Sequence, residues 1–155
     1  MAAGIHIKSP PSGGLLAFND PNSKVHFTMT LPLKLLCVAL AGGLGTLSRF
    51  GLASLVQRLA GPGFPWGTAS VNIIGCFLFG LVWTAGTEKM AISVEARTII
   101  LTGFMGAFTT FSTFISETSQ LTGSGQWVSA FGNVLFQVAV GLLLFMCGAA
   151  LARLI

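Results

Sequence analysis

The sequence has very little charge. Lys and Arg number 8 and Asp and Glu number 4, so charged residues occupy 8% of the 155 positions, while 53% are hydrophobic. Soluble domains carry about 25% charged residues. The mean hydropathy of +0.83 therefore indicates a protein of the lipid bilayer. The net charge of +4 comes from too few groups to indicate binding to nucleic acid.

Residues that usually build catalytic and metal sites are also scarce. The 2 histidines, His6 and His26, both lie near the N-terminus. The 3 cysteines fall in three different apolar segments without a CxxC pair, so we expect them to be small buried apolar residues. No Ser-His-Asp set, phosphate loop or metal cluster can be assembled from this sequence. We therefore do not expect an enzyme.

Residues 1–28 differ in character from the rest of the chain. Pro, Gly, Asn and Asp interrupt any helical or strand periodicity of hydrophobic residues there. This predicts a disordered N-terminal tail, followed by a transmembrane domain over residues 29–155. Two alternatives compete with this reading. Met29 is a plausible start, and Lys24 and Lys34 could flank the apolar core of a signal peptide at 35–40. The apolar pattern, however, continues where a cleaved peptide would end.

Four apolar segments are long enough to cross a bilayer of about 30 Å as helices. They are expected at residues 33–59, 66–85, 98–116 and 128–151, with the third ending at Glu117. Gly-rich and Pro-rich turns precede Trp66 and Trp127, which are placed as interfacial anchors. The pattern predicts an all-α membrane protein with four transmembrane helices.

The third segment differs in composition from a helix that serves only to cross the membrane. Residues 102–114 read T-G-F-M-G-A-F-T-T-F-S-T-F, where a simple span would carry Leu, Ile and Val. Glycines loosen a helix, and hydroxyls in hydrocarbon need partners. We therefore expect this segment to lie against protein or a wet pathway. Glycines 42, 43 and 45 of the first segment are expected to permit close helix contact.

Polar groups inside the apolar segments are mainly hydrogen-bond donors. The hydroxyls belong to Thr109, Thr110, Ser112 and Thr113, and Asn72 is the only amide of the second segment. The acidic residues are all expected in the tail or at segment ends: Asp20, Glu88, Glu95 and Glu117. Donors without fixed negative charge suit a small anion, whereas proton-coupled pumps and exporters of cationic drugs usually need an embedded carboxylate.

Several of these side chains allow two interpretations. Asn72 could join helices by a hydrogen bond or donate to a permeating anion. Arg49 could face the interior of the bundle or reach the membrane surface. Phe111 and Phe114 share a helical face, where they could serve packing or present positive ring edges to an anion. Asn133 and Gln137 also lie on one helical face of the fourth segment.

Three motifs resemble the fluoride channel family known as Fluc or CrcB. They are G-F-M-G-A-F-T-T-F-S-T-F at 103–114, G-G-L-G-T-L-S-R-F at 42–50 and V-N-I-I-G at 71–75. The resemblance extends over all four apolar segments, which follow one another in the same order as in that family. It implies a dual-topology antiparallel homodimer with two pores in the inner (plasma) membrane of a microbe, which exports fluoride by passive electrodiffusion.

The resemblance also implies roles for individual residues. The fluoride pore would be lined by Asn72, Thr110, Phe111, Ser112, Thr113, Phe114 and Glu117. Within it, Phe111 and Phe114 would present ring edges, and Ser112, Thr113 and Glu117 would form a polar track. Gly106 and Thr109 match a break in the third helix, where backbone carbonyls would hold a structural sodium ion (Na+) at the dimer interface. Arg49 would have a structural or vestibular role.

The basic residues near the segment ends are unevenly distributed. One side would carry Lys24, Lys34, Lys89, Arg97 and Arg153, and the other side Arg58 alone. This bias favours one orientation with the N-terminus inside, whereas an antiparallel dimer requires both. Two rival functions are a small dual-topology multidrug transporter, which would need an embedded Glu, and a membrane assembly subunit that transports nothing.

Overall fold

The computed structural model describes residues 29–155, and it contains four helical spans in that part of the chain. They are α1 (Leu31–Ala60), α2 (Trp66–Thr87), a composite third span (Val94–Gly123) and α6 (Trp127–Leu154). Each is long and apolar enough to cross a membrane, which confirms the predicted four-span, all-helical architecture. The predictions for residues 1–28, a disordered tail or a signal peptide, fall outside the described residues.

The third span is not a continuous α-helix. It comprises α3 (Val94–Thr98), the π-helix η1 (Ile99–Met105), α4 (Gly106–Phe108) and α5 (Phe111–Gly123). Between α4 and α5, Thr109 (φ −82°, ψ 158°) and Thr110 (φ −147°, ψ 109°) are extended. The predicted break at 106–110 is therefore narrower than expected. Gly106 itself is helical, and only two residues leave the helix.

The prediction that the third span ends at Glu117 is wrong. The helix continues to Gly123, so Glu117 lies inside α5, about 9 Å before its end at 1.5 Å per residue. The hydroxyls inside this helix are satisfied by backbone carbonyls one turn back. Thr118 Oγ1 donates to Phe114 O at 2.7 Å, and Thr122 Oγ1 donates to Thr118 O at 2.9 Å.

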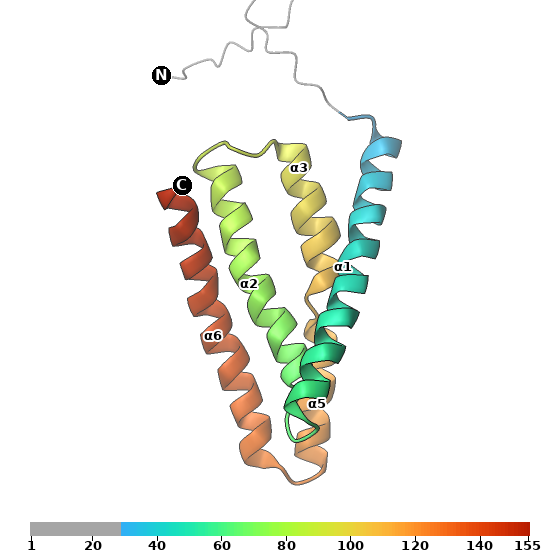
Figure 1. The fold of residues 1–155 in the computed structure, drawn as a ribbon, viewed down its shortest axis with the longest axis vertical. Helices are drawn as coiled ribbons and strands as arrows, with labels where there is room; N and C mark the ends of the chain where they lie inside the picture. The colour runs from blue at the N-terminus through green and yellow to red at the C-terminus, as the bar shows by residue number, and fades with distance from the viewer. Residues whose placement is uncertain (1–28) are drawn as a thin grey trace, which may run out of the picture.

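Glycines bring α2 and α6 into close contact, and the two helices run side by side in Figure 1. A Cβ atom at Gly80 would overlap the carbonyl oxygen of Phe145, and one at Gly148 would overlap that of Phe77. Small residues allow such an approach of two backbones, and van der Waals packing then holds helices together in lipid. This pair is the most extensive helix contact of the described chain.

In contrast, α1 buries little of its own surface, although it contacts α2, η1 and α4. Gly45 is its only buried residue, and a Cβ there would overlap the Phe104 carbonyl oxygen. The expectation of close contact is confirmed for Gly45, whereas nothing within the single chain lies within 4 Å of a Cβ position at Gly43. Most large apolar side chains of α1 are exposed in this single chain.

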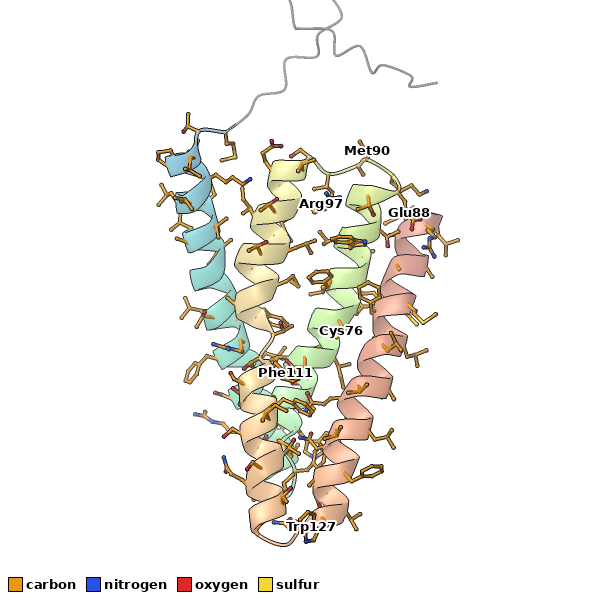
Figure 2. All side chains as sticks on the ribbon, turned by 180° about the vertical axis from the view of Figure 1, so that it is seen from behind. Cys76, Glu88, Met90, Arg97, Phe111 and Trp127 are labelled. Carbon is orange, nitrogen blue, oxygen red and sulfur yellow. The ribbon has the colours of Figure 1, made fainter. Side chains whose placement is uncertain are left out.

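The two ends of the bundle carry different charge. The start of α1, the α2–α3 loop and the end of α6 share one end (Figure 1), and Glu88 and Arg97 lie there, opposite Trp127 (Figure 2). Arg153 forms a salt bridge with Glu88 at 2.7 Å, and this hydrogen-bonded guanidinium lowers the pKa of the Glu88 carboxyl. Basic side chains gather at this end, as the sequence predicts, while Arg58 is in the last turn of α1 at the other end.

Replacing Gly148 by Ala should destabilise the protein. The new methyl group would meet backbone atoms of α2, which cannot move as a side chain can, so we expect a cost of about 1–3 kcal/mol. Gly132→Ala on the same helix is the matched control because nothing lies within 4 Å of its Cβ position. Thermal unfolding in detergent would measure both variants, and equal midpoints would contradict the packing described for Gly148.

Candidate functional site

The break in the third span is held by the side chain of Asn72 on α2. Its Oδ1 accepts a hydrogen bond from the Thr110 N–H at 2.8 Å, and its Nδ2 donates to the Thr110 carbonyl at 3.1 Å. One carboxamide therefore satisfies both backbone groups of an extended residue inside the membrane. Without it, each unpaired group would cost several kcal/mol in hydrocarbon.

Asn72 has no amide hydrogen left over. Its Nδ2 also donates to Gln137 Oε1 on α6 at 2.7 Å, so both N–H bonds are directed at protein acceptors. Of the two interpretations of Asn72, the inter-helix hydrogen bond describes this geometry. An anion near Asn72 would meet an amide that is already engaged.

Thr110 begins α5 as its N-cap. Its Oγ1 accepts from the Thr113 N–H at 3.3 Å and donates to Thr113 Oγ1 at 2.9 Å. The N–H groups in the first turn of a helix have no partner within the helix and form its positive end. The break thus places the positive end of α5 partway along the span, next to Asn72.

The same hydrogen bonds release two carbonyl groups. In a continuous helix the Gly106 carbonyl would accept from the Thr110 N–H, and the Thr109 carbonyl from the Thr113 N–H. Here the Thr110 N–H is bound to Asn72 and the Thr113 N–H to the Thr110 hydroxyl. Over residues 29–155, no cluster of three His, Cys, Asp or Glu could hold a metal ion. Oxygens such as these two carbonyls are ligands that hard cations accept.

A groove of about 430 Å³ lies between α2, α5 and α6 beside the break. Its polar residues are Asn72, Thr109, Thr110 and Gln137, and its aromatic residues are Phe79, Phe111, Phe114 and Phe145. None of the residues lining it is charged. The groove therefore combines five of the predicted site residues in an apolar setting with a few amides and hydroxyls.

The two phenylalanines of the site differ in exposure. Phe114 is buried, while Phe111, at the start of α5 (Figure 2), is 75% exposed. Their ring centroids lie 5.7 Å apart with the planes tilted by 48°. The rings can therefore both face a species in the groove, but a single chain leaves Phe111 without a cover.

Three other predicted site residues, Thr113, Glu117 and Arg49, do not line the groove. Thr113 and Arg49 line a cavity of about 250 Å³ between α1, α2 and α5, which Thr110 also borders. It adjoins a second cavity of about 430 Å³ lined by Thr113, Glu117 and Arg58. We call these two cavities the crevice. The interior-facing interpretation of Arg49 fits this placement, and Ser112 is exposed on the outside of α5.

Glu117 is embedded, which the sequence analysis did not expect. Its Oε1 accepts from the Thr68 hydroxyl at 2.7 Å. Its Oε2 is buried and has no hydrogen-bond partner in the described part of the chain. Glu117 also borders a pocket of about 520 Å³ at the end of the bundle near Pro62 and Gln126. Glu117 therefore lines both the crevice and this pocket.

Sequence reasoning missed the partners of the predicted residues. Gln137 and Asn133 are buried in α6, and the sequence indicated only that they share a face. Thr68 binds Glu117, and Gln57 ties α1 to the following turn through Gly61, Phe64 and Gly67. A polar side chain in an apolar segment signals that a partner exists, but does not say which one.

Comparison with known proteins identifies the family. The family model described as CrcB-like protein, Camphor Resistance (CrcB), matches residues 36–149. Proteins named fluoride-specific ion channel FluC are similar over 122 residues, or 79% of this chain. That of Solidesulfovibrio magneticus is 54% identical over 98% of its length, that of Nitrosococcus oceani 49% over 98%, and that of Dehalococcoides mccartyi 39% over 94%. The chain belongs to the CrcB family.

Proposed function

We propose that this protein is a fluoride-selective channel that releases fluoride from the cytoplasm by passive electrodiffusion. The observation that carries the proposal is the uncharged groove beside the helix break, where Asn72, Phe111 and Phe114 meet. Fluoride enters cells as neutral HF and ionises inside, so an open path down its gradient is sufficient for export. The names of the similar proteins support the same ion.

The groove suits an anion because it offers positive ends of dipoles without fixed charge. The N-terminus of α5 presents its first-turn N–H groups at the break, and such ends attract anions. The edge of a phenyl ring is also positive, so Phe111 and Phe114 can contact fluoride without binding it tightly. The hydroxyls of Ser112 and Thr113, and then Glu117, would form the polar track outside the groove, and Thr113 and Glu117 line the crevice on the other side of α5.

We propose that a second copy of the chain packs against the exposed polar surface of the third span and the exposed Phe111. In a bilayer, exposed polar side chains need protein or water beside them. Thr102, Ser112, Thr113 and Ser116 are exposed on the third span, and Phe111 is unprotected. We propose an antiparallel homodimer, with two fluoride pores, that covers these residues in the inner membrane. Basic residues gather at one end of the bundle, which favours insertion with that end in the cytoplasm, whereas the proposed antiparallel dimer requires both orientations.

A structural sodium ion is proposed for the dimer axis. The carbonyls of Gly106 and Thr109 have lost their helical donors, and oxygen ligands are what hard cations prefer. Two such carbonyls from each subunit would give a site of four oxygens. The ion would hold the two breaks together and would not itself be transported.

The rival functions are less well supported. A multidrug transporter needs an embedded carboxylate, and Glu117 now supplies one that the sequence analysis did not expect. Arg58 lines the same crevice, however, and its positive charge would repel a bulky cation at Glu117. A subunit that serves only assembly does not account for the helix break. Interrupting a helix inside the bilayer costs free energy, and packing alone does not require it.

Purified protein in liposomes loaded with potassium fluoride should release fluoride once valinomycin compensates the charge. A fluoride-selective electrode follows the release, and liposomes without protein provide the background. Equal release of chloride from matched liposomes, or no release of either halide, would contradict the proposed function.

Replacing Phe111 or Phe114 by Ile should slow fluoride release about tenfold, because the aliphatic side chain has no positive edge. The dimer should remain intact in size-exclusion chromatography. Phe131→Ile is the matched control, since Phe131 is also a phenyl group on a span and is 69% exposed away from the groove. Wild-type rates in both pore variants would show that the rings serve packing only.

Sodium should stabilise the dimer in a saturable way. A ligand that binds only the folded state adds about 2.7 kcal/mol when its concentration is 100 times its Kd. At constant ionic strength, replacing N-methylglucamine by Na+ should therefore raise the unfolding midpoint, and potassium should do so much less. Identical midpoints in all three salts would rule out the sodium site while leaving the anion pathway in place.

A further inference from the structure

Four side chains form a hydrogen-bonded chain behind the groove, which we call the amide relay: Asn72, Gln137, Asn133 and Thr118. Asn72 Nδ2 donates to Gln137 Oε1 at 2.7 Å, and Gln137 Nε2 donates to Asn133 Oδ1 at 2.8 Å. Asn133 Nδ2 then donates to Thr118 Oγ1 at 2.9 Å, and Thr118 Oγ1 donates to the Phe114 carbonyl at 2.7 Å. The relay thus links α2, α6 and α5.

The direction of every bond in the relay is fixed by backbone groups at its two ends. The Thr110 N–H can only donate, so Asn72 must turn its oxygen toward it. The Phe114 carbonyl can only accept, so the Thr118 hydroxyl must donate to it and accept from Asn133. If one of the amides in between were flipped, so that its oxygen and nitrogen exchanged places, two N–H groups or two oxygens would face each other. The neighbouring amide would then have to flip as well to restore the hydrogen bond.

The middle of the relay is buried, so water cannot replace the bond between Gln137 and Asn133, while Asn72 and Thr118 are half-buried. Asn133 is 0% exposed and Gln137 is 8% exposed within the single chain. A buried donor left without an acceptor costs more than the hydrogen bond itself gives. Asn133 and Thr118 do not line the groove, and any effect they have on it must pass through Gln137 and Asn72.

We propose that Gln137, Asn133 and Thr118 are positioning residues that hold the Asn72 carboxamide, and with it the extended backbone at Thr110, in register with the groove. This rests on the proposed function for its consequence, which is the rate of fluoride passage. The relay also connects the two sides of the site. It starts at the backbone of Thr110 and ends on the backbone of Phe114, whose ring lines the same groove.

The remote end of the relay gives the sharpest test. Thr118→Val keeps the shape of the side chain but removes the hydroxyl, while Thr118→Ser keeps the hydroxyl. In T118V the Asn133 Nδ2 loses its acceptor, and the hold on Asn72 should weaken. Hydrogen–deuterium exchange at the Thr110 amide, three side chains away, should become about tenfold faster in T118V and stay at the wild-type rate in T118S.

A general loss of stability must be separated from this effect. Gly67→Ala weakens the α1–α2 contact without touching the relay bonds or the α2–α6 contact, so it serves as the control, compared at conditions that give the same unfolding midpoint. Unchanged exchange at Thr110 in T118V would overturn the proposal. So would an equal rise in G67A. If T118V does not yield monodisperse protein, T118A is compared with T118S in its place.

Fluoride release provides a second readout. T118V should slow release about tenfold per folded channel, and T118S should restore it. Normal release together with fast exchange at Thr110 would overturn the claim that the relay matters for passage. If the wild-type protein released no fluoride, the proposed function would fail, while the exchange comparison would still decide whether the relay positions Asn72.

Discussion

The structure depends on one requirement, which is that no backbone N–H or C=O inside a bilayer can stay unpaired. The third span meets this requirement at its break through the two hydrogen bonds between Asn72 and Thr110. Because the Asn72 side chain pairs with the backbone N–H and C=O of Thr110, a new helix, α5, can start there with its positive N-terminal end in the membrane interior. The carbonyls of Gly106 and Thr109 are released by the same exchange of partners. The anion pathway and the cation site proposed here therefore have a single physical origin.

The sequence predicted the helices better than the contacts between them. Apolar runs of sufficient length are enough to place four spans, and the single amide of the second run marked Asn72 as important. Its partners could not be predicted, because Gln137 lies 65 positions away and meets it only through the register of α2 on α6. That register is set by glycine contacts such as Gly148 on Phe77, which leave no periodic signal. Glu117 was misplaced because polarity was equated with the end of a span.

The bundle has a firm half and a more loosely attached half. Glycines lock α2 to α6, and Asn72 and Gln137 extend from these two helices to each other across the tightest contact. The broken span is anchored to this frame through Thr110, and α1 packs on the broken span from Val38, against Gly103, to Gly45, against Phe104. A site that must be positioned within a fraction of an ångström benefits from being built on the rigid pair. The exposed face of α1 and α5 is then left for contact with another molecule.

The position of negative charge decides how the embedded carboxylate should be interpreted. Glu117 and the groove lie on different sides of α5, because Glu117 faces Thr68 in the crevice while Phe114 faces Gln137 in the groove. Arg49 and Arg58 line the same crevice as Glu117, so the described part of that cavity holds charge of both signs. A carboxylate in such surroundings repels an anion less than one placed alone in hydrocarbon would. An acidic residue in a span is therefore compatible with anion passage when the narrowest contacts are made by amides, hydroxyls and ring edges elsewhere.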